Sequence, residues 1–600
     1  MITSKIIHII QQQSISKMAL FLSICFIVLF RGTHVEQKEI TWDVFGYYLP
    51  LPATFIYNDP LLENRGWVDE LNEKKQLTGT VYQISTTEEG KPMYFFLFGM
   101  SLFYSLFFFI GHVLAGFTGF AQDGFSQPYQ LAMVYGAIIY TIVGLVYLRK
   151  IIRHFFTDKI AAIVFVLIVF ATNYTHHLTL KNLETVNVLF MLCTLLFWNT
   201  IQWHKTFQFK NLLGIGLSLS FMILVKPSEL LLLLLPLFWG VFSRKTFKEK
   251  LTLIATHKGP FVGVIALCFL LFIPQLMYWQ FKTGHFIYDS YKNPGVGLDF
   301  LNPHLIEALF SYKKGWLLYT PIAIFGLLGF FELKQKNPSV FPAFFLAFFS
   351  SFYLVVSWTE WWYGAGFSIR PLITYYPLLA IPLGYFIVRI AEAKKSVQMI
   401  FGSVFILFTA FNQFQWWQLR NYILDPYYTT KDYYWATFLQ TSVQPSDLKL
   451  KAFQRDFNGQ QVFNNQKDYT KHLAFERNFN ELAHSIYQSD STEEFALTNQ
   501  FPYQDLTAKD HAWIHVSFRY KTDNTGEIPL FAMMLDRKEG NYGYQVFDLK
   551  NTNTWESVSF YYLTPPIRST KDELKSYFWK RSECNLEVDD FKLEVFSPKK

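Results

Sequence analysis

Long apolar stretches recur through the first 417 residues of the chain and are separated by shorter polar segments. Twelve of them approach or exceed the roughly 20 apolar residues that a helix needs to cross a bilayer. They lie at about 15–31, 94–116, 130–148, 159–173, 186–203, 211–225, 229–243, 260–279, 316–331, 339–357, 372–389 and 398–416. Beyond residue 417 such stretches stop. The pattern therefore predicts a polytopic α-helical membrane protein of about 11–12 spans, followed by a soluble domain.

The last part of the chain shows a different hydrophobic pattern. Apolar and polar residues alternate in WIHVSFRY (513–520), GYQVFDLK (543–550), ESVSFYYL (556–563) and DFKLEVF (590–596), which is typical of half-buried strands. Ile514, Val516, Phe518 and Tyr520 would share one face. We predict a membrane domain over 1–416, an aromatic interfacial linker over 417–450, and a mainly-β, sandwich or jelly-roll-like domain over 451–600. Trp513 and Trp555 are the aromatic residues we would place at a sugar contact in this domain.

Composition narrows the class of protein further. Hydrophobic residues make up 51% of the chain and charged residues 16%, against about 25% charged in an ordinary soluble protein. This excludes a purely cytosolic enzyme and a disordered chain. The four cysteines form neither a disulfide framework nor a metal-binding spacing, and no nucleotide-binding fingerprint is present. The charge of +7 is concentrated in short loops, so it indicates membrane topology and not a nucleic-acid partner.

The loops between the apolar stretches fall into two alternating sets. The loops 149–159, 204–210, 243–258, 332–338 and 389–395 hold 16 Lys and Arg residues. The longer loops 174–185, 226–229, 280–315 and 357–371 hold 7. By the positive-inside rule the first set is cytoplasmic, so the second set and the C-terminal domain are external.

This assignment requires that the stretch 94–116 does not cross the membrane an odd number of times. We favour a helix that lies in or dips into the outer leaflet, within one long first external loop of membrane-surface helices. The alternative is a twelfth span, which would place the C-terminal domain on the same side as the N-terminus.

Under the favoured topology the residues suited to chemistry lie mainly on the external side. They are Asp43, Lys91, His176, His177, Lys181, Glu184, Lys226, Glu229, Glu360, Trp361, Trp362 and Arg370. Each also has a structural explanation: acids at helix starts stabilise the helix, Lys and Arg extend toward headgroups, and Trp and Tyr form interfacial belts. Adjacent histidines suit a single metal site poorly. A functional role for this set is favoured because all of its members lie on the same face of the membrane.

The order of these features resembles the membrane-embedded C-type glycosyltransferases, in particular bacterial relatives of protein O-mannosyltransferases and lipid A aminoarabinose transferases. The resemblance covers roughly residues 10–430. It depends on Asp43 with Tyr47 and Tyr48 after the first span, on Lys91-Pro92 before an apolar stretch, on Glu184 at the start of a span, and on Trp358, Trp361, Trp362, Gly364 and Arg370 before a late span. Asp43 lacks an acidic neighbour, since Trp42 and Val44 flank it.

The resemblance implies inverting transfer of a sugar from a polyprenyl-phosphate donor to a protein, lipid or glycan acceptor on the external face. Asp43 would be the general base and Glu184 a second catalytic carboxylate that orients acceptor or sugar. Lys91 and Arg370 would bind the donor phosphate. Tyr47, Tyr48, His177, Trp361 and Trp362 would contact substrate. No metal ligand is assigned and no cofactor is required, although a divalent cation stays open.

Two other functions are compatible with the same topology. A transporter or flippase for lipid-linked saccharides would place charges inside spans and show inverted repeats, whereas the acids here lie at span edges. A polymerase or ligase that joins glycan blocks would share the lipid chemistry. In every case we expect an integral membrane protein of the bacterial inner (plasma) membrane with an external C-terminal domain.

Overall fold

The computed structural model forms two compact units. One comprises residues 1–291 and 298–427, and the other residues 292–297 and 428–600. The structure describes residues 14–599 except 79–80, 88, 257, 292–296, 428, 445–446, 448–466, 468, 480–485, 490–492, 510–511, 524–527, 538–539, 551, 565–571 and 581–582. Most of the start of the predicted domain 451–600 therefore lies outside the described residues.

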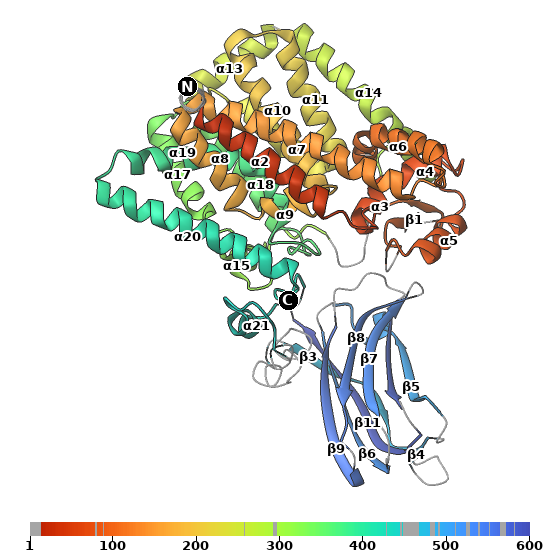
Figure 1. Cartoon of the computed structure of the whole chain (residues 1–600). Helices are drawn as coiled ribbons and strands as arrows, with labels where there is room; N and C mark the ends of the chain where they lie inside the picture. The colour runs from red at the N-terminus through yellow and green to blue at the C-terminus, as the bar shows by residue number, and fades with distance from the viewer. Residues whose placement is uncertain are drawn as a thin grey trace. The chain divides into compact units, whose positions relative to one another are not determined.

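The first unit is a bundle of apolar helices, drawn from red to green in Figure 1. Seven helical segments in the described part of the chain are long and apolar enough to cross a membrane. They are α2 (Ile15–Thr33), α6 (Gly99–Thr118), α7 (Gln127–Phe155), α10 (Thr185–Thr206), α14 (Lys258–Thr283), η2 with α19 (Arg370–Tyr375 and Tyr376–Ala391), and α20 (Lys395–Arg420). The predicted polytopic membrane class is confirmed.

Shorter apolar helices complete the bundle. They are α8 (Asp158–Phe170), α11 (Phe209–Val225), η1 with α12 (Pro227–Leu233 and Leu234–Phe238), α17 (Ala323–Lys336) and α18 (Phe341–Val356). Each of the twelve apolar stretches in the sequence corresponds to a helix or a helix pair. Pro227 is the first residue of η1 and Pro371 the second residue of η2, positions where the missing N–H of proline removes no helical hydrogen bond.

The five basic loops meet at one end of this bundle, which we call the basic end. Contacts within or directly beside these loops pair His154 with Lys205, His204 with Lys250, the Gly240 N–H with the Ser339 carbonyl, and Lys336 with Glu392. The N-terminus of α2 lies there as well, because the Arg149 guanidinium donates to Ser16 at 2.9 Å. The alternation predicted from the basic residues is thus reproduced by the fold.

The other loops meet at the opposite end, which we call the site end. Contacts join Lys282 to the Leu62 carbonyl, Leu298 to Trp358, Asn173 to the Phe367 carbonyl, Lys314 to the Gly366 carbonyl, and Arg420 to His34. Short elements build this end: α3 (Trp42–Tyr48), α4 (Pro50–Phe55), α5 (Gly66–Lys75), β1 (Ile84–Thr86), β2 (Pro92–Tyr94), α9 (Tyr174–Thr179), α15 (Leu305–Phe310) and α16 (Trp316–Tyr319).

Helix α6 begins and ends beside this first loop. Near its start the Ser101 hydroxyl donates to the Tyr47 carbonyl at 2.7 Å. Just after its end the Tyr48 hydroxyl donates to the Gly124 carbonyl at 2.5 Å, and Lys75 pairs with Asp123 at 2.6 Å. Figure 1 shows α6 beside α4. The start of α6 and the segment just after its end thus both contact the first loop; α6 is long enough to span, and the in-plane interpretation stays a prediction.

The second unit contains a two-sheet β structure, blue in Figure 1. Its strands are β3 (Tyr469–Arg477), β4 (Tyr487–Gln488), β5 (Phe495–Pro502), β6 (Trp513–Asp523), β7 (Leu530–Arg537), β8 (Gly540–Asp548), β9 (Thr552–Leu563), β10 (Glu573–Trp579) and β11 (Asn585–Pro598), with the short helices α21 (Lys431–Ala436) and α25 (Tyr503–Leu506). One sheet has the order β5-β10-β7-β8 and the other β3-β11-β6-β9, with β4 on β11. All described pairs are antiparallel.

The alternation in β6 explains how the sheets pack. Ile514, Val516, Phe518 and Tyr520 are all buried and belong to one apolar core, which confirms the face predicted from the sequence. Phe518 contacts Phe531 and Phe578 of the other sheet at 5.0 and 4.9 Å between ring centroids. The mainly-β prediction is confirmed. Trp513 is buried in a small separate cluster, whereas Trp555 is 39% exposed beside the Arg519 guanidinium.

Candidate functional site

Asp43 projects from the first turn of α3, where the helix N-terminus favours a negative charge. The preceding residue, Trp42, has φ 51°, a left-handed conformation that is rare for a bulky side chain. Its N–H donates to the Leu77 carbonyl at 3.1 Å, and its carbonyl accepts from the Gln83 amide at 3.0 Å. The backbone that presents Asp43 is therefore held in a strained conformation from both sides, as often occurs at functional sites.

Arg370 joins Asp43 to Glu184. Its Nη2 lies 2.5 Å from Asp43 Oδ2, and its Nη1 lies 3.2 Å from Glu184 Oε2. The exposed fractions are 28% for the Asp43 side chain, 22% for Arg370 and 12% for Glu184. The planar guanidinium suits this bridging role because its N–H groups form a fixed fork. Three residues that the sequence placed in separate loops thus form one cluster, open to its surroundings at Asp43.

Glu184 is the N-cap residue of α10, but its side chain makes no capping hydrogen bond. The carboxylate instead lies beside Arg370 and 3.2 Å from His177 Nδ1. Burial alone would raise the pKa of Glu184, yet the Arg370 guanidinium and the His177 ring hold the pKa well below its usual range. Glu184 therefore makes no capping hydrogen bond, and its carboxylate is ionised in this cluster.

The loop before Arg370 has an unusual backbone. Tyr363, Gly364, Gly366 and Ser368 all have positive φ, at 52°, 68°, 132° and 58°. A Cβ built on Gly364 would lie 3.9 Å from Arg370 Nη2, and one on Gly366 would lie 4.0 Å from the His177 ring. The two glycines therefore permit left-handed backbone directly beside the charged groups.

This loop is held by groups from distant segments. The Asn173 amide donates to the carbonyls of Phe367 at 3.1 Å and Ile369 at 3.4 Å, the Ser368 hydroxyl donates to the Lys314 carbonyl at 3.1 Å, and the Lys314 ammonium donates to the Gly366 carbonyl. Several fixed contacts on one short loop keep the position of Arg370 well defined.

Two further cations accompany Arg370. Lys314 is 1% exposed, and among the described residues no carboxylate lies within 4.0 Å of its ammonium. Burial, Arg370 and Lys313 lower the pKa of Lys314 well below its ordinary value. Burial also lowers the pKa of Lys226, opposed by Glu229; its ammonium lies 5.4 Å from the Tyr363 ring centroid. Glu229 in turn accepts from the Tyr375 hydroxyl at 3.0 Å.

Two tyrosines adjoin Asp43. The Tyr82 hydroxyl donates to Asp43 Oδ1, and burial together with that carboxylate raises the pKa of Tyr82 well above 10. Tyr47, one turn after Asp43 on α3, stacks on Phe96 at 4.0 Å between ring centroids. Burial, Tyr291 and Asp43 raise the pKa of Tyr47 as well. Both tyrosines are therefore neutral hydroxyl groups near the carboxylate.

The remaining sequence candidates have other contacts. Lys91 is half exposed and pairs with Glu89 at 2.8 Å. Tyr48 is fully buried, and its hydroxyl is bonded to Gly124, because five positions along α3 turn it away from the Asp43 face. Trp361 is 8% exposed, and Trp362 contacts the Lys313 ammonium at 3.8 Å from its ring centroid. Direct substrate contact by Lys91 or Tyr48 receives no support from these positions.

His176 and His177 are both buried, so neither imidazole ring faces solvent. His177 contacts Glu184. Glu184 in turn contacts Arg370, which contacts Asp43. Burial lowers the pKa of His176 well below its ordinary value. Among the described residues no group of three or more His, Cys, Asp or Glu side chains is arranged to hold a metal ion. A divalent cation stays a prediction, and no step below is routed through one.

Residues 125–279 match the model of a family described as dolichyl-phosphate-mannose-protein mannosyltransferase. The match confirms, for this segment, the resemblance predicted from the sequence. The segment contains His177, Glu184 and Lys226, but neither Asp43 nor Arg370.

Among solved structures, the chain is similar to the apo form of an oligosaccharyltransferase from Archaeoglobus fulgidus, with 12% sequence identity and a TM-score of 0.41. The similarity covers 73% of this chain and 59% of that chain, which is less than two thirds of its length. No curated protein sequence matches the chain.

Proposed function

We propose that the chain is a membrane glycosyltransferase that moves a sugar from a polyprenyl-phosphate donor to an acceptor hydroxyl on the external face, with inversion at the anomeric carbon. The observation that carries this proposal is the convergence of Asp43, Glu184 and Arg370 at distances of 2.5 and 3.2 Å. The family match over residues 125–279 supports a lipid-linked sugar donor.

In this reaction the acceptor oxygen attacks the anomeric carbon while the bond from that carbon to the phosphate oxygen breaks. Asp43 takes the acceptor proton, as a positioned carboxylate does in general-base catalysis. Asp43 is the most exposed member of the cluster at 28%, so it is the carboxylate that an incoming hydroxyl reaches first. Glu184 keeps its negative charge beside Arg370 and fixes the orientation of the guanidinium.

The leaving polyprenyl phosphate gains one negative charge as the bond breaks. It therefore needs cations and not a general acid. Arg370 is the partly exposed cation of the site, and two of its five N–H donors are accounted for by Asp43 and Glu184. Lys314 and Lys226 add positive charge behind it. Lys91 stays a predicted contact of the donor phosphate.

The test uses purified protein in lipid nanodiscs and a panel of radiolabelled polyprenyl-phosphate sugars, with transfer of label to acceptor as the measurement. Asp43→Asn removes the proton acceptor with little change of shape. General-base catalysis contributes roughly 10²–10⁴-fold, so turnover should fall at least about 100-fold while donor still binds.

Asp69→Asn is the matched control. Asp69 lies in the same first loop on α5, and its side chain is 44% exposed in a pair with Arg65; such surface pairs contribute about 0–1 kcal/mol. This variant should stay within about twofold of wild type. Full turnover by Asp43→Asn would remove Asp43 from the mechanism, and full turnover by both Asp43→Asn and Glu184→Gln would remove the transferase proposal.

A further inference from the structure

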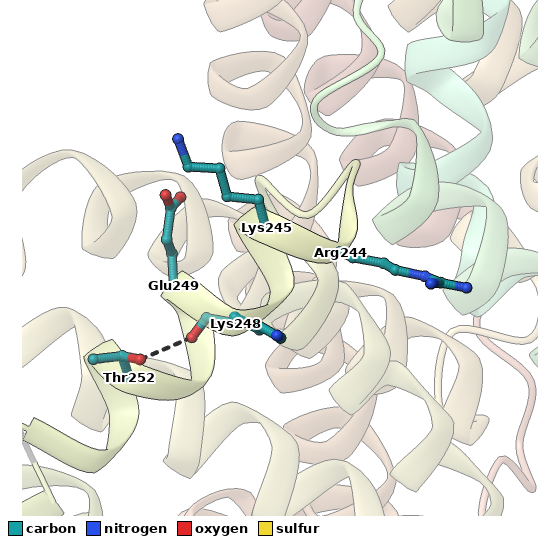
Figure 2. A pocket seen from close by; sticks show the side chains of 5 residues that line it. All are labelled: Arg244, Lys245, Lys248, Glu249 and Thr252. Carbon is teal, nitrogen blue, oxygen red and sulfur yellow. Dashed lines mark hydrogen bonds between the residues drawn. The ribbon is translucent and has the colours of Figure 1, made fainter.

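Helix α13 (Arg244–Thr256) joins α12 to α14 at the basic end and carries an exposed cationic face. Arg244, Lys245, Lys248, Glu249 and Thr252 line an open hollow of about 580 Å³ (Figure 2). In Figure 2 the Lys245 and Glu249 side chains extend from one side of the helix, and Arg244 and Lys248 from another. Among the described residues none of the three cations has a carboxylate within 4.0 Å. With three cations and one acid, the lining of the hollow carries a net charge of +2.

The opposite side of α13 is fixed to the bundle. Lys250 is 8% exposed, donates to the Trp239 carbonyl at 3.1 Å, and contacts His204 at the end of α10. Phe247 stacks on Phe238 with 6.2 Å between ring centroids. These contacts hold the helix in one orientation, so the cationic face has a defined direction.

A third sector of α13 is apolar and exposed. Phe247 is 37% exposed and Leu251, one turn later, is 47% exposed. Phe242, just before the helix, is 58% exposed. At 100° per residue, Phe247 and Leu251 lie between the Lys250 side and the Arg244 side of the helix. Exposed apolar residues beside a row of cations are typical of a helix that lies in a membrane interface.

The position of α13 along the bundle agrees with that setting. The helix precedes α14, one of the segments long enough to cross a membrane. Its neighbour His204 is followed by Lys205, which contacts His154 at the end of α7. The helix thus lies where the apolar spans end and the basic loops gather, which is the depth of lipid headgroups.

We infer that α13 is a binding site for the headgroups of anionic phospholipids, with Arg244, Lys245 and Lys248 contacting the phosphates and Phe247 and Leu251 entering the acyl region. The inference is independent of the transferase chemistry, since α13 contributes no residue to the Asp43 cluster. Free phosphate could also bind the three cations. The exposed residues Phe247 and Leu251 distinguish the two ligands, because only a lipid can cover them.

The experiment titrates detergent-purified full-length protein with phosphatidylglycerol and with phosphatidylcholine, and counts bound lipids by native mass spectrometry. A basic residue near an anionic surface contributes roughly fivefold in affinity, so three contribute on the order of 100-fold. Wild type should prefer phosphatidylglycerol by about that factor. The triple variant Arg244→Gln, Lys245→Gln, Lys248→Gln should lose the preference, whereas Lys245→Arg with Lys248→Arg should keep it and shows that the helix still folds.

A matched control neutralises three exposed lysines outside α13, Lys38, Lys74 and Lys509, and should keep the wild-type preference. Leu251→Ser should weaken phosphatidylglycerol binding without changing the net charge. The inference is overturned if wild type shows no preference, if the triple variant keeps it, or if millimolar inorganic phosphate displaces the lipid and Leu251→Ser has no effect. That last result would define a free-phosphate site.

Discussion

Replacement of Arg370 by lysine is the most informative single change, because it keeps the charge and removes the planar fork. In wild type, one guanidinium contacts Asp43 at 2.5 Å through Nη2 and Glu184 at 3.2 Å through Nη1. A lysine has one nitrogen and reaches only one carboxylate with comparable geometry. The variant therefore loses at least one charge-assisted hydrogen bond, which contributes about 1.5–3 kcal/mol.

Converted at about 1.4 kcal/mol per tenfold, this loss predicts that kcat/KM for the donor falls roughly 10- to 150-fold in Arg370→Lys. Arg370→Ala removes both contacts and leaves two carboxylates without a cation, a change that costs about 3–5 kcal/mol at buried pairs. A cycle that combines Arg370→Lys with Glu184→Gln should show a coupling of about 0.5–3 kcal/mol. Label transfer from a polyprenyl-phosphate sugar measures the four proteins of the cycle and Arg370→Ala.

Arg389→Lys is the control on the same helix. Arg389 lies near the other end of α19, is 66% exposed, and approaches Glu332 only to 4.0 Å, so the variant should stay within a few-fold of wild type. Wild-type kcat/KM in both Arg370→Lys and Arg370→Ala would refute the reasoning. So would an equal loss in Arg389→Lys, since it would reflect a general effect of arginine replacement on the fold.

Three further outcomes are expected. Tyr82→Phe removes the hydroxyl that donates to Asp43, so turnover should fall about tenfold, and unchanged turnover would show that this bond is dispensable. Because the pKa of Glu184 is lowered in the folded protein, its stabilising ion pair is complete above the ordinary carboxyl pKa of about 4.3 and weakens as pH falls below it. The difference in apparent Tm between wild type and Glu184→Gln should thus be constant from neutral pH to about 5 and shrink at lower pH; shrinkage already near pH 6 would contradict the lowered pKa. In intact cells, an impermeant thiol reagent should label Leu301→Cys and spare Lys394→Cys, and the reverse pattern would invert the topology.

The large features of the fold follow from local patterns in the sequence. Apolar stretches became helices because a bilayer-length segment satisfies its backbone hydrogen bonds internally. The alternation at Ile514, Val516, Phe518 and Tyr520 became the core face of β6 because side chains on a strand alternate between its two faces. The sorting of loops by Lys and Arg content likewise matched the two ends of the bundle, since contacts such as His154 with Lys205 join loops of one set.

The candidate site was only partly predictable, because its contacts join distant segments. Asp43 and Arg370 are 327 positions apart, and Tyr82 is 39 positions from the carboxylate it bonds. Nothing in the sequence around Tyr82 marks it as an Asp43 partner. Lys314 directly follows Lys313 in the sequence, and no sequence feature indicates that Lys314 is buried. Tyr47 and Tyr48 are adjacent in the sequence, yet Tyr48 turns away from Asp43 to donate to the Gly124 carbonyl, and its substrate contact stays a prediction.

The contacts of Asp43 place a constraint on the order of events in the proposed reaction. One carboxylate oxygen accepts from Tyr82 and the other lies 2.5 Å from Arg370, so both oxygens already hold a donor. Each carboxylate oxygen has a second lone pair, but the acceptor hydroxyl must still reach an oxygen that already holds a donor. A donor phosphate that shares the Arg370 guanidinium would relieve this pairing. In the proposed mechanism the donor phosphate therefore binds Arg370 first and frees Asp43 Oδ2 for the acceptor hydroxyl.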